Sequence, residues 1–215
     1  MRAPMNRPLL FDTRRAVRHL KHADVRLAEL ISRVGPCRLR LRPAPTPFEA
    51  LLRAVTYQQL SGKAAASIYS RVLGLFPIAE GPTPERLLAL PEAAVRSAGL
   101  SRNKLLAVRD LAAKVLDGSV PDFPLLDHMT DAEIIARLTR VRGVGRWTVE
   151  MLLIFTLGRP DVLPLDDLGI RKGFQLAYGM QHLPAVRTLQ RAGRRWAPYC
   201  SVASWYLWRA VDTSM

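Results

Sequence analysis

Two stretches of the chain combine residue types that could bind an anion and stabilise charge during a reaction. The first is Gly143-Val144-Gly145, which is flanked by Arg142 and Arg146. Glycines permit positive φ and keep side chains away from an approaching ligand. Backbone N–H groups in such a turn, and in the first turn of a following helix, attract an anion with help from the helix dipole. The stretch therefore favours a phosphate-binding turn over an ordinary helix–helix connection.

The second stretch contains a pair of carboxylates, Asp166 and Asp167, about twenty residues after the turn. Two adjacent acids near a phosphate-binding surface repel the ligand, so their presence needs a reason. One of them is expected to be the N-cap of the next helix. The other can project into a pocket and take part in chemistry.

The elements that must position these residues are predicted to be helices. Helix starts are predicted from five capping signals, namely Asp24, Thr46, Thr83, Ser101 and Thr130. The helix that starts at Thr130 should run to about Arg140, and residues 147–157 are apolar on all sides, as in a buried helix. Residues 37–42 alternate like a strand but lack a partner, so we interpret them as an extended linker. With no run of convincing strands, the predicted fold is all-α.

Composition restricts the class of protein further. The chain has 215 residues, enough for one domain or two small lobes, and its formal net charge is +14. Only five of its 32 basic residues are lysines. Guanidinium groups bind phosphate in a bidentate fork and stack on bases. A GC-rich genome would account for the ratio of arginine to lysine but not for the charge imbalance, which favours a nucleic-acid partner.

Cysteine content and hydropathy exclude several other classes. Cys37 and Cys200 are the only cysteines, which is too few for a four-cysteine zinc site or an iron–sulfur cluster. The four histidines have no metal-binding spacing. The chain has neither an 18-residue apolar run nor an apolar segment after its start, so we expect no membrane span and no signal peptide. A cytoplasmic protein is the default expectation, associated with the nucleoid through DNA binding.

The residues from Gly143 to Thr148 and from Leu163 to Asp167 together resemble the helix-hairpin-helix DNA glycosylases, most closely the 3-methyladenine DNA glycosylase II branch. The resemblance runs from about Phe48 to Trp208 and includes the Tyr57–Ser61 helix end and the turn from Gly99 to Lys104. It implies an all-α fold of two helical lobes, with a helix-hairpin-helix motif and an active-site cleft between the lobes. We expect an N-terminal helical arm (1–46) that packs with the C-terminal lobe, a central lobe (47–157), and a C-terminal lobe (158–215) carrying the catalytic residue.

The resemblance also implies a role for several side chains. Asp167 is the catalytic carboxylate, which leaves Asp166 as the expected helix cap. Trp147 stands where relatives that nick DNA through a Schiff base have a lysine, and an indole cannot form an imine. Trp147, Trp208 and Tyr57 are expected to line the pocket for the damaged base. The implied activity is therefore removal of an alkylated purine without strand cleavage.

Further residues are expected to contact duplex DNA. They lie in the hairpin, at the Tyr57–Ser61 helix end and in the turn before Lys104: Arg142, Gly143, Val144, Gly145, Arg146, Thr148, Gln58, Gln59, Leu60, Ser61 and Lys104. Base flipping leaves a gap in the stack that a side chain must fill. Gln59 matches the family's wedge position, whereas Leu60 is physically the more natural plug, and the sequence does not separate the two.

The chain departs from the family pattern at three points. The roughly 45 residues before Pro47 are too few for the N-terminal β-domain of larger members, so a compact form is expected. Met151 replaces a pocket tyrosine, and Cys200 stands where arginine is expected. We expect no cofactor and no metal ligands among the side chains, although a structural cation held by backbone carbonyls at the hairpin would leave no trace in the sequence. A monomer without an obligate protein partner is expected.

Two alternatives remain at this point. The same scaffold could serve a glycosylase for other damaged bases, such as deaminated or oxidised ones. It could also serve a non-catalytic helix-hairpin-helix protein that binds distorted DNA. The carboxylate at Asp167 argues against the pure binder, which has no need of a negative charge near its ligand.

Overall fold

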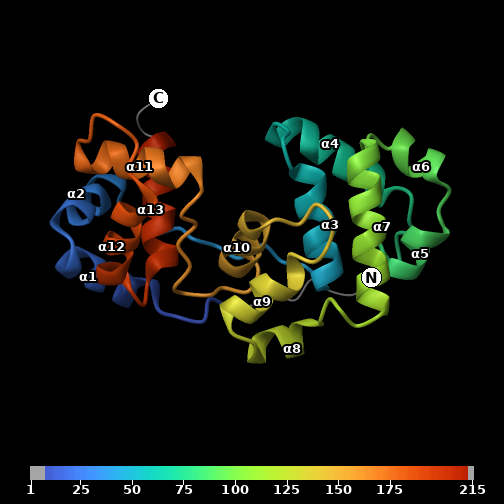
Figure 1. Ribbon diagram of the computed structural model, residues 1–215, viewed down its shortest axis with the longest axis horizontal. Coiled ribbons are helices and arrows are strands. Elements are labelled where there is room, and N and C mark those ends of the chain that lie inside the picture. The colour runs from blue at the N-terminus through green and yellow to red at the C-terminus, as the bar shows by residue number, and fades with distance from the viewer. Residues whose placement is uncertain (1–7, 213–215) are drawn as a thin grey trace. The chain divides into compact units, whose positions relative to one another are not determined.

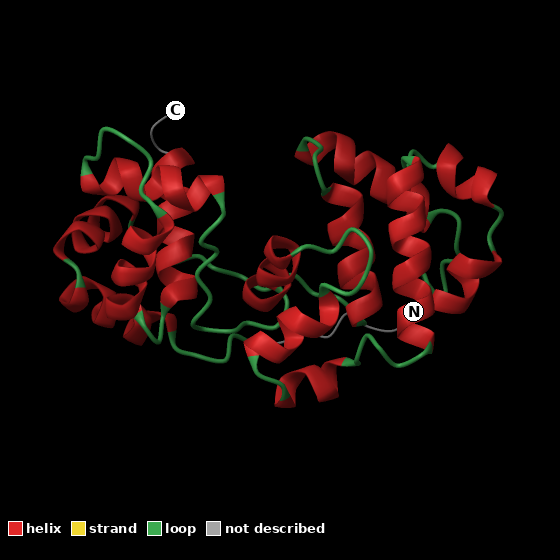
Figure 2. Cartoon of the chain, viewed as in Figure 1, coloured by secondary structure: helices red, strands yellow, loops and turns green. Residues whose placement is uncertain are grey.

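The computed structural model describes residues 8–212. Thirteen helices and no strands occur within this range, so the expected all-α fold is confirmed (Figures 1 and 2). The loose arm expected before about Leu10 lies largely outside the described residues. The linker expected at residues 37–42 is extended, without regular secondary structure.

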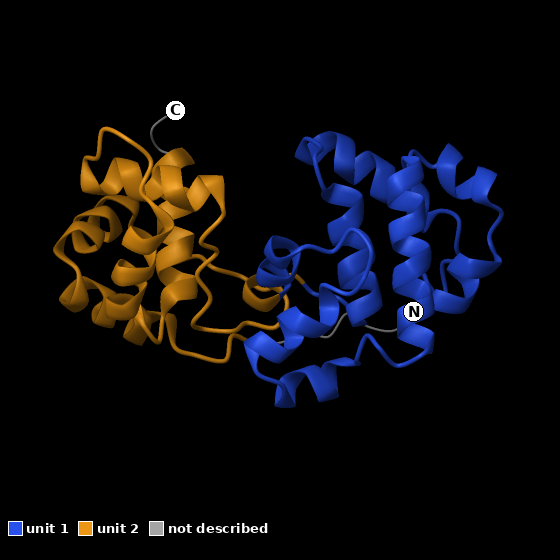
Figure 3. Ribbon diagram, in the orientation of Figure 1, with its two compact units in different colours: residues 1–6, 43–152 blue, residues 7–42, 153–215 orange. Residues whose placement is uncertain are grey.

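The chain divides into two compact units (Figure 3). Among the described residues, unit 1 comprises 43–152, and unit 2 comprises 8–42 together with 153–212. The first segment of unit 2 therefore packs with the C-terminal part of the chain, although more than a hundred residues separate them.

Most helices of unit 1 begin at a side-chain cap. Its helices are α3 (Pro47–Tyr57), α4 (Gly62–Leu73), α5 (Pro84–Ala89), α6 (Glu92–Ser97), α7 (Arg102–Leu116), α8 (Phe123–His128), α9 (Asp131–Leu138) and the first part of α10 (Arg146–Phe155). The hydroxyls of Thr46, Thr83 and Ser101 accept N–H bonds from the third residue after each, which confirms these predicted caps. Thr130 and Glu133 form a full capping box at α9, as predicted, and the helix ends at Leu138 rather than near Arg140.

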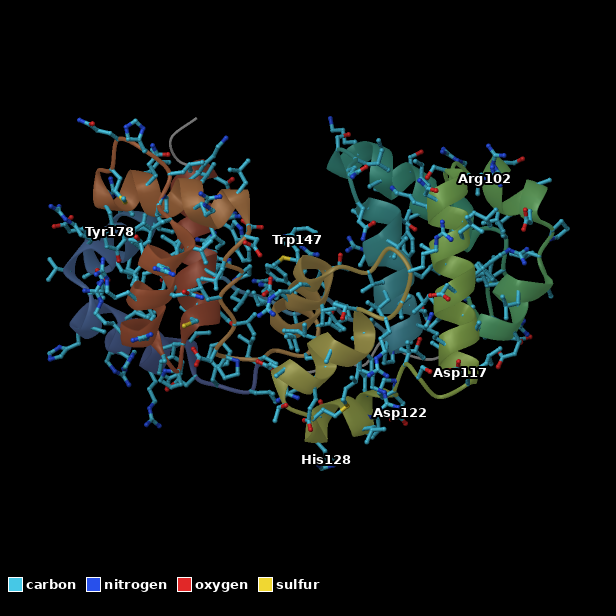
Figure 4. All side chains as sticks on the ribbon, in the orientation of Figure 1. Arg102, Asp117, Asp122, His128, Trp147 and Tyr178 are labelled. Carbon is cyan, nitrogen blue, oxygen red and sulfur yellow. The ribbon has the colours of Figure 1, made fainter. Side chains whose placement is uncertain are left out.

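Helix α10 is not buried on all of its sides, as had been expected. Val149, Leu153 and Ile154 are fully buried, but Trp147 in the first turn is 46% exposed. The expectation of a helix buried on all sides from Trp147 onward is therefore wrong at its N-terminal end. Figure 4 labels this tryptophan.

Unit 2 contains five helices around one apolar core. They are α1 (Thr13–Ala23), α2 (Val25–Val34), α11 (Leu168–Tyr178), α12 (Val186–Trp196) and α13 (Cys200–Asp212). Helices α11 and α13 approach closely at Gly173, where an added Cβ would lie 1.9 Å from the Leu207 carbonyl oxygen. This contact holds α11, whose N-terminus carries Asp167, against the longest helix of the unit.

Asp24 connects the two sequence segments of unit 2. It is the N-cap of α2, as predicted, and its Oδ1 accepts the Leu27 N–H. Its Oδ2 accepts bonds from the Tyr178 hydroxyl (2.5 Å), Arg195 Nη2 (2.9 Å) and Trp196 Nε1 (3.1 Å). Burial, followed by the bond to Asp24, raises the pKa of Tyr178 above its ordinary value. The buried carboxylate is thus compensated by one charged and three neutral donors.

Candidate active site

The Gly143–Gly145 turn joins α9 to α10 in unit 1, as predicted. Gly143 has φ +73°, and a Cβ there would lie 3.0 Å from the Ala107 Cβ, so both backbone conformation and packing require glycine. Gly145 faces open space, because an added Cβ would meet no atom within 4 Å. The Gly145 carbonyl accepts the Val149 N–H (3.2 Å), which places Gly145 at the start of α10. The unpaired N–H groups in the first turn of the ten-residue helix α10 therefore follow a glycine that has open space beside it.

Two of the predicted hairpin residues are internal. Val144 is 3% exposed and Thr148 is 4% exposed. The Val144 N–H donates to the Val141 carbonyl (3.0 Å), which closes the turn. Their side chains therefore fix the shape of the hairpin from inside, and only their backbone could meet a ligand.

The two arginines beside the turn are held in different ways. Arg142 donates its backbone N–H to Asp110 Oδ2 (2.7 Å), and its side chain is exposed. Arg146 donates Nε to Glu150 Oε1 (2.9 Å); the Arg146 side chain is 62% exposed, whereas that of Glu150 is 6% exposed. Both guanidinium groups are accessible beside the turn, and Arg146 is oriented by its ion pair.

Asp110 supports the hairpin, although the sequence analysis did not identify it. Besides the Arg142 N–H, it accepts Lys114 Nζ at 2.6 Å on each carboxylate oxygen. Desolvation raises the pKa of Asp110, but the bonds from Arg142 and Lys114 outweigh it and hold the pKa below its usual value. Only the i,i+4 spacing of Asp110 and Lys114 was visible in the sequence.

Gln58 links the end of α3 to the hairpin. Its Nε2 donates to the Gly143 carbonyl (2.9 Å) and to Thr148 Oγ1 (3.1 Å). Lys104 Nζ donates to the carbonyls of Thr56 and Gln58, each at 2.8 Å. Burial lowers the pKa of Lys104. Gln58 and Lys104 thus make internal bonds that fix the helix end relative to the turn, and their predicted contacts with DNA stay predictions.

The next residues of this segment are turned outward. Gln59 has φ +56°, in the left-handed region that non-glycine residues rarely adopt, and its side chain is exposed. Leu60 is 40% exposed, and Ser61 caps α4 by accepting the Ala64 N–H (3.5 Å). Gln59 and Leu60 thus stand at the tip of a turn whose base is held by Gln58 and Lys104.

The three predicted pocket aromatics have different surroundings. The Tyr57 ring is covered by the Arg53 guanidinium (4.1 Å to the centroid) and contacts Tyr69 edge-on (6.2 Å). Trp147 and Tyr57 belong to unit 1, whereas Trp208 belongs to unit 2. Trp208 lies beside Phe155 at a centroid distance of 5.6 Å.

Asp167, rather than Asp166, is the N-cap of α11. Its Oδ1 accepts the Ile170 N–H (2.7 Å) and the Trp208 Nε1–H (3.0 Å), and the residue is only 9% exposed. Asp166 is exposed. The expectation that Asp166 is the helix cap is therefore wrong, because Asp167 caps the helix. The catalytic role expected of Asp167 stays a prediction. The fixed positions of the Ile170 and Trp208 donors hold Asp167 in one orientation.

Gly169 explains how Trp208 reaches Asp167. A Cβ on this glycine would lie 2.9 Å from Trp208 Cδ1 and 3.0 Å from Asp167 Oδ1. Any larger residue would force the indole away from the carboxylate. Glycine at this position is therefore part of the site, and its exact contact partner, 39 residues away, could not be read from spacing.

The loop before Asp167 is bonded to the start of α13. Ser201 Oγ donates to the Arg159 carbonyl (2.6 Å) and accepts the Val162 N–H (3.0 Å), and Ser204 Oγ donates to the Val162 carbonyl (3.3 Å). Both serines are fully buried. They fix the loop that delivers Asp167 to the start of α11, and the sequence analysis missed them.

Cys200 also belongs to this support. Its backbone N–H donates to Asp161 Oδ1 (3.1 Å), and its Sγ lies 3.4 Å from the Gly193 carbonyl. Burial, followed by the interaction of the thiol itself with the Asp161 carboxylate, raises the pKa of the thiol well above its ordinary value. Cys200 is thus a structural residue at the start of α13. No group of three or more potential metal ligands occurs among residues 8–212.

A groove of about 1330 Å³ in unit 1 lies away from these residues. It is lined by the start of α3, the loop before α5 and the end of α7. None of the predicted site residues lines it. The groove therefore does not coincide with the residues that were predicted to carry the function.

Comparison with known proteins identifies the family. Residues 52–198 match the HhH-GPD superfamily of base excision DNA repair proteins, and the chain belongs to this family. It is 36% identical to DNA-3-methyladenine glycosylase 1 of Schizosaccharomyces pombe, over 89% of this chain and 84% of that protein. It is 30% identical to DNA-3-methyladenine glycosylase 2 of Escherichia coli, over 83% of this chain and 63% of that protein. The resemblance noted in the sequence is thereby confirmed.

Two solved structures have the same fold at similar identity. The S. pombe 3-methyladenine DNA glycosylase in complex with abasic DNA has a TM-score of 0.79 and 35% identity, with 91% of this chain and 95% of that chain covered. DNA-3-methyladenine glycosidase from Bacillus halodurans has a TM-score of 0.83 and 36% identity, with 93% and 90% covered. Among residues 8–212, no helix is long and apolar enough to cross a membrane.

Proposed function

We propose that this protein is a monofunctional DNA glycosylase that hydrolyses the N-glycosidic bond of alkylated purines in duplex DNA. The observation that carries the proposal is the environment of Asp167, a buried carboxylate oriented by the Ile170 N–H and the Trp208 indole. The family membership and the names of the similar proteins support the same reaction class. The expected monomeric state and nucleoid-associated location stay predictions.

Asp167 would act through its charge. As the bond between the sugar and the base breaks, positive charge develops on C1′ and the ring oxygen, and a nearby fixed carboxylate stabilises it. The departing base keeps the bonding electron pair, and water then adds to C1′ with loss of a proton. An alkyl group at N3 or N7 already makes the purine cationic and a good leaving group. The reaction therefore needs little help from a general acid.

Trp147 would define both the substrate and the product. Its partly exposed indole offers an electron-rich face on which a cationic methylated purine can stack. Because indole cannot form an imine with the sugar, the product should be an abasic site in an intact strand. Borohydride should trap no covalent adduct with the enzyme, and the strand should break only after alkali or heat.

The hairpin would bind the backbone of the same DNA. The open Gly145, the start of α10 and the exposed Arg146 provide backbone N–H groups and one oriented guanidinium for a phosphate. Gln59 or Leu60 would fill the gap left by the flipped base. Gln59→Gly removes the side chain while relieving the positive φ, and Leu60→Ala removes only the apolar contact. The variant that loses base release while keeping its melting temperature identifies the wedge.

The test of the proposal is Asp167→Asn, with Asp166→Asn as the matched control. Asparagine is as good an N-cap as aspartate and its Oδ1 can still accept the Trp208 N–H, so the fold should survive. Release of alkylated bases from methylated duplex, measured by mass spectrometry, should fall roughly 10²–10³-fold, as when one preorganised electrostatic group is removed. The exposed Asp166 should be replaceable with little effect.

The same assay separates the alternatives. If Asp167→Asn releases alkylated purines at the normal rate, the catalytic role of Asp167 is wrong. If the unmodified protein binds methylated duplex but releases no base, it is a binder of distorted DNA. Release of only deaminated or oxidised bases would place it among glycosylases for other lesions.

A further inference from the structure

The positive charge of the chain is concentrated away from the hairpin. Among the described residues, unit 2 contains 17 lysines and arginines and 7 acidic residues, a formal charge of +10. Unit 1, which contains the hairpin, has 13 basic and 11 acidic residues, a formal charge of +2. A phosphate-binding role for the hairpin alone leaves this excess in unit 2 unexplained.

Much of the excess positive charge of unit 2 lies on one face of α12. Four of its residues are exposed arginines at positions i, i+4, i+7 and i+8, which share one side of a helix: Arg187, Arg191, Arg194 and Arg195. The opposite side is buried through Leu189, Ala192, Gly193 and Trp196. Helix α12 is therefore amphipathic, with arginine rather than mixed charge on its outer face.

Helix α1 repeats this pattern. Its exposed basic residues stand at positions i, i+1, i+4 and i+7: Arg14, Arg15, Arg18 and Lys21. Ala16 and Leu20 are fully buried beneath them. Neither α1 nor α12 contains an acidic residue. Like charges along one helix face destabilise the helix, so their accumulation indicates a ligand of opposite charge.

The two helices lie in contact on the same core (Figure 1). His19 of α1 packs against Tyr199, just after α12, with ring centroids 5.4 Å apart. Of the eight basic residues on the two faces, only Arg195 forms an ion pair within the described part of the chain, with Asp24. The α1 and α12 faces thus adjoin and present mostly uncompensated guanidinium groups.

We propose that the exposed basic faces of α1 and α12 form a second phosphate-binding surface for duplex DNA, separate from the hairpin. The proposal goes beyond the glycosylase reaction and requires only that the protein binds DNA. Arginines spaced along adjacent helices suit the repeating phosphates of a duplex backbone, without reading sequence. The surface would hold the enzyme on undamaged DNA and carries no part of the chemistry.

The test is a triple variant of α12, Arg187→Gln/Arg191→Gln/Arg194→Gln, which leaves the Arg195–Asp24 ion pair intact. Its affinity for long undamaged duplex is measured by fluorescence anisotropy over a range of salt concentrations. Each lost phosphate contact lowers the slope of log Kobs against log [salt] by about 0.9, so the slope should fall by roughly 2–3 units. The melting temperature should not fall, because the three side chains are exposed and their removal relieves repulsion along the helix face.

The matched control is Arg33→Gln/Arg38→Gln/Arg96→Gln, which removes the same charge from exposed arginines elsewhere. A smaller slope change in the control than in the α12 variant supports the proposal. An equal change would overturn it, because the effect would then come from net charge alone. Loss of binding to structured RNA or polyglutamate, with duplex DNA binding unchanged, would likewise overturn it and identify a different polyanion.

Base release from a short methylated duplex at saturating enzyme separates this proposal from the proposed function. The α12 variant should release bases at the normal rate, because no residue of the Asp167 site is altered. If the wild-type protein released no bases, the glycosylase proposal would fail. The salt-dependence slope would still show whether the basic faces of α1 and α12 bind duplex DNA.

Discussion

In unit 1, several charged side chains around the hairpin bond to the protein itself, whereas in unit 2 all the basic side chains on α1 and α12 except Arg195 lack such bonds within the described residues. Asp110, Lys104 and Glu150 each hold a backbone group or an arginine near the turn. Arg187, Arg191 and Arg194 have no such bonds within the described residues. Unit 1 therefore offers shape, backbone N–H groups and the exposed guanidinium groups of Arg142 and Arg146 to a phosphate, whereas unit 2 has the larger surplus of positive charge.

The two units also differ in how they use glycine. Gly145 in unit 1 leaves open space for a ligand, while Gly173 in unit 2 is filled by the Leu207 carbonyl. The space beside Gly145 is open to a ligand that approaches from solvent. Unit 2 is instead packed tightly behind the carboxylate that it orients.

Gly173→Ala should give the largest effect. A methyl group 1.9 Å from the Leu207 oxygen forces α11 and α13 apart, so the free energy of unfolding should fall by more than about 3 kcal/mol. Gly145→Ala should leave stability within roughly 0.5 kcal/mol but weaken duplex binding about tenfold, through a methyl group in the path of the phosphate. Thermal denaturation and DNA titration of both variants check the pair. Equal stability losses would remove the contrast between the units.

Trp208→Phe should give the next largest effect. It keeps an aromatic ring beside Phe155 but removes the N–H bonded to Asp167 Oδ1. Hydrogen bonds to charged groups contribute about 1.5–3 kcal/mol, so kcat for base release should fall roughly 10- to 100-fold. Affinity for undamaged duplex should remain unchanged, because Trp208 belongs neither to the hairpin nor to the basic faces of α1 and α12. A change in affinity with normal kcat would assign Trp208 to binding rather than to positioning the carboxylate.

The same two units show where prediction from the sequence succeeds. The Thr130–Glu133 capping box and the Gly143–Gly145 turn are encoded within a few residues, and both were predicted correctly. The cap at Asp167 was assigned to the wrong neighbour, because adjacent aspartates are equivalent in local sequence. Only the Trp208 indole, 41 residues away, and the packing at Gly169 distinguish them.

Long-range bonds limit the prediction of the DNA-facing residues in the same way. Gln58 is predicted to contact DNA, and the structure adds a bond from its amide to Gly143, 85 residues along the chain, that the sequence did not indicate. Polar side chains near a predicted binding turn can serve the ligand or the turn itself. Spacing alone does not separate the two roles, because the deciding acceptors are backbone carbonyls.

Gln58→Leu should have a moderate effect confined to unit 1. It keeps the size of the side chain but removes both bonds of Nε2, to the Gly143 carbonyl and to Thr148. Two neutral hydrogen bonds, partly exposed, should be worth about 1–2 kcal/mol of unfolding free energy. Duplex binding should weaken, while kcat at saturating DNA should stay within about twofold. Denaturant titration and single-turnover assays measure the two quantities. A loss of kcat larger than the loss of affinity would show that Gln58 acts on chemistry.

Asp110 should give the smallest effect and a distinct dependence on pH. Its pKa is lowered in the folded protein, because the bonds from Arg142 and Lys114 outweigh desolvation. The carboxylate therefore contributes stability that is fully present above its unfolded pKa of about 3.9. This contribution is lost as the pH falls through the lower, folded pKa. Asp110→Asn should accordingly reduce the free energy of unfolding by roughly 1 kcal/mol at neutral pH, and the difference from wild type should shrink below about pH 4.

The α12 triple variant should show no such pH dependence, because its arginines have no carboxylate partner among the described residues. Denaturant unfolding at a series of pH values would measure both variants, and a pH-independent difference for Asp110→Asn would show that the carboxylate does not brace the hairpin through its charge.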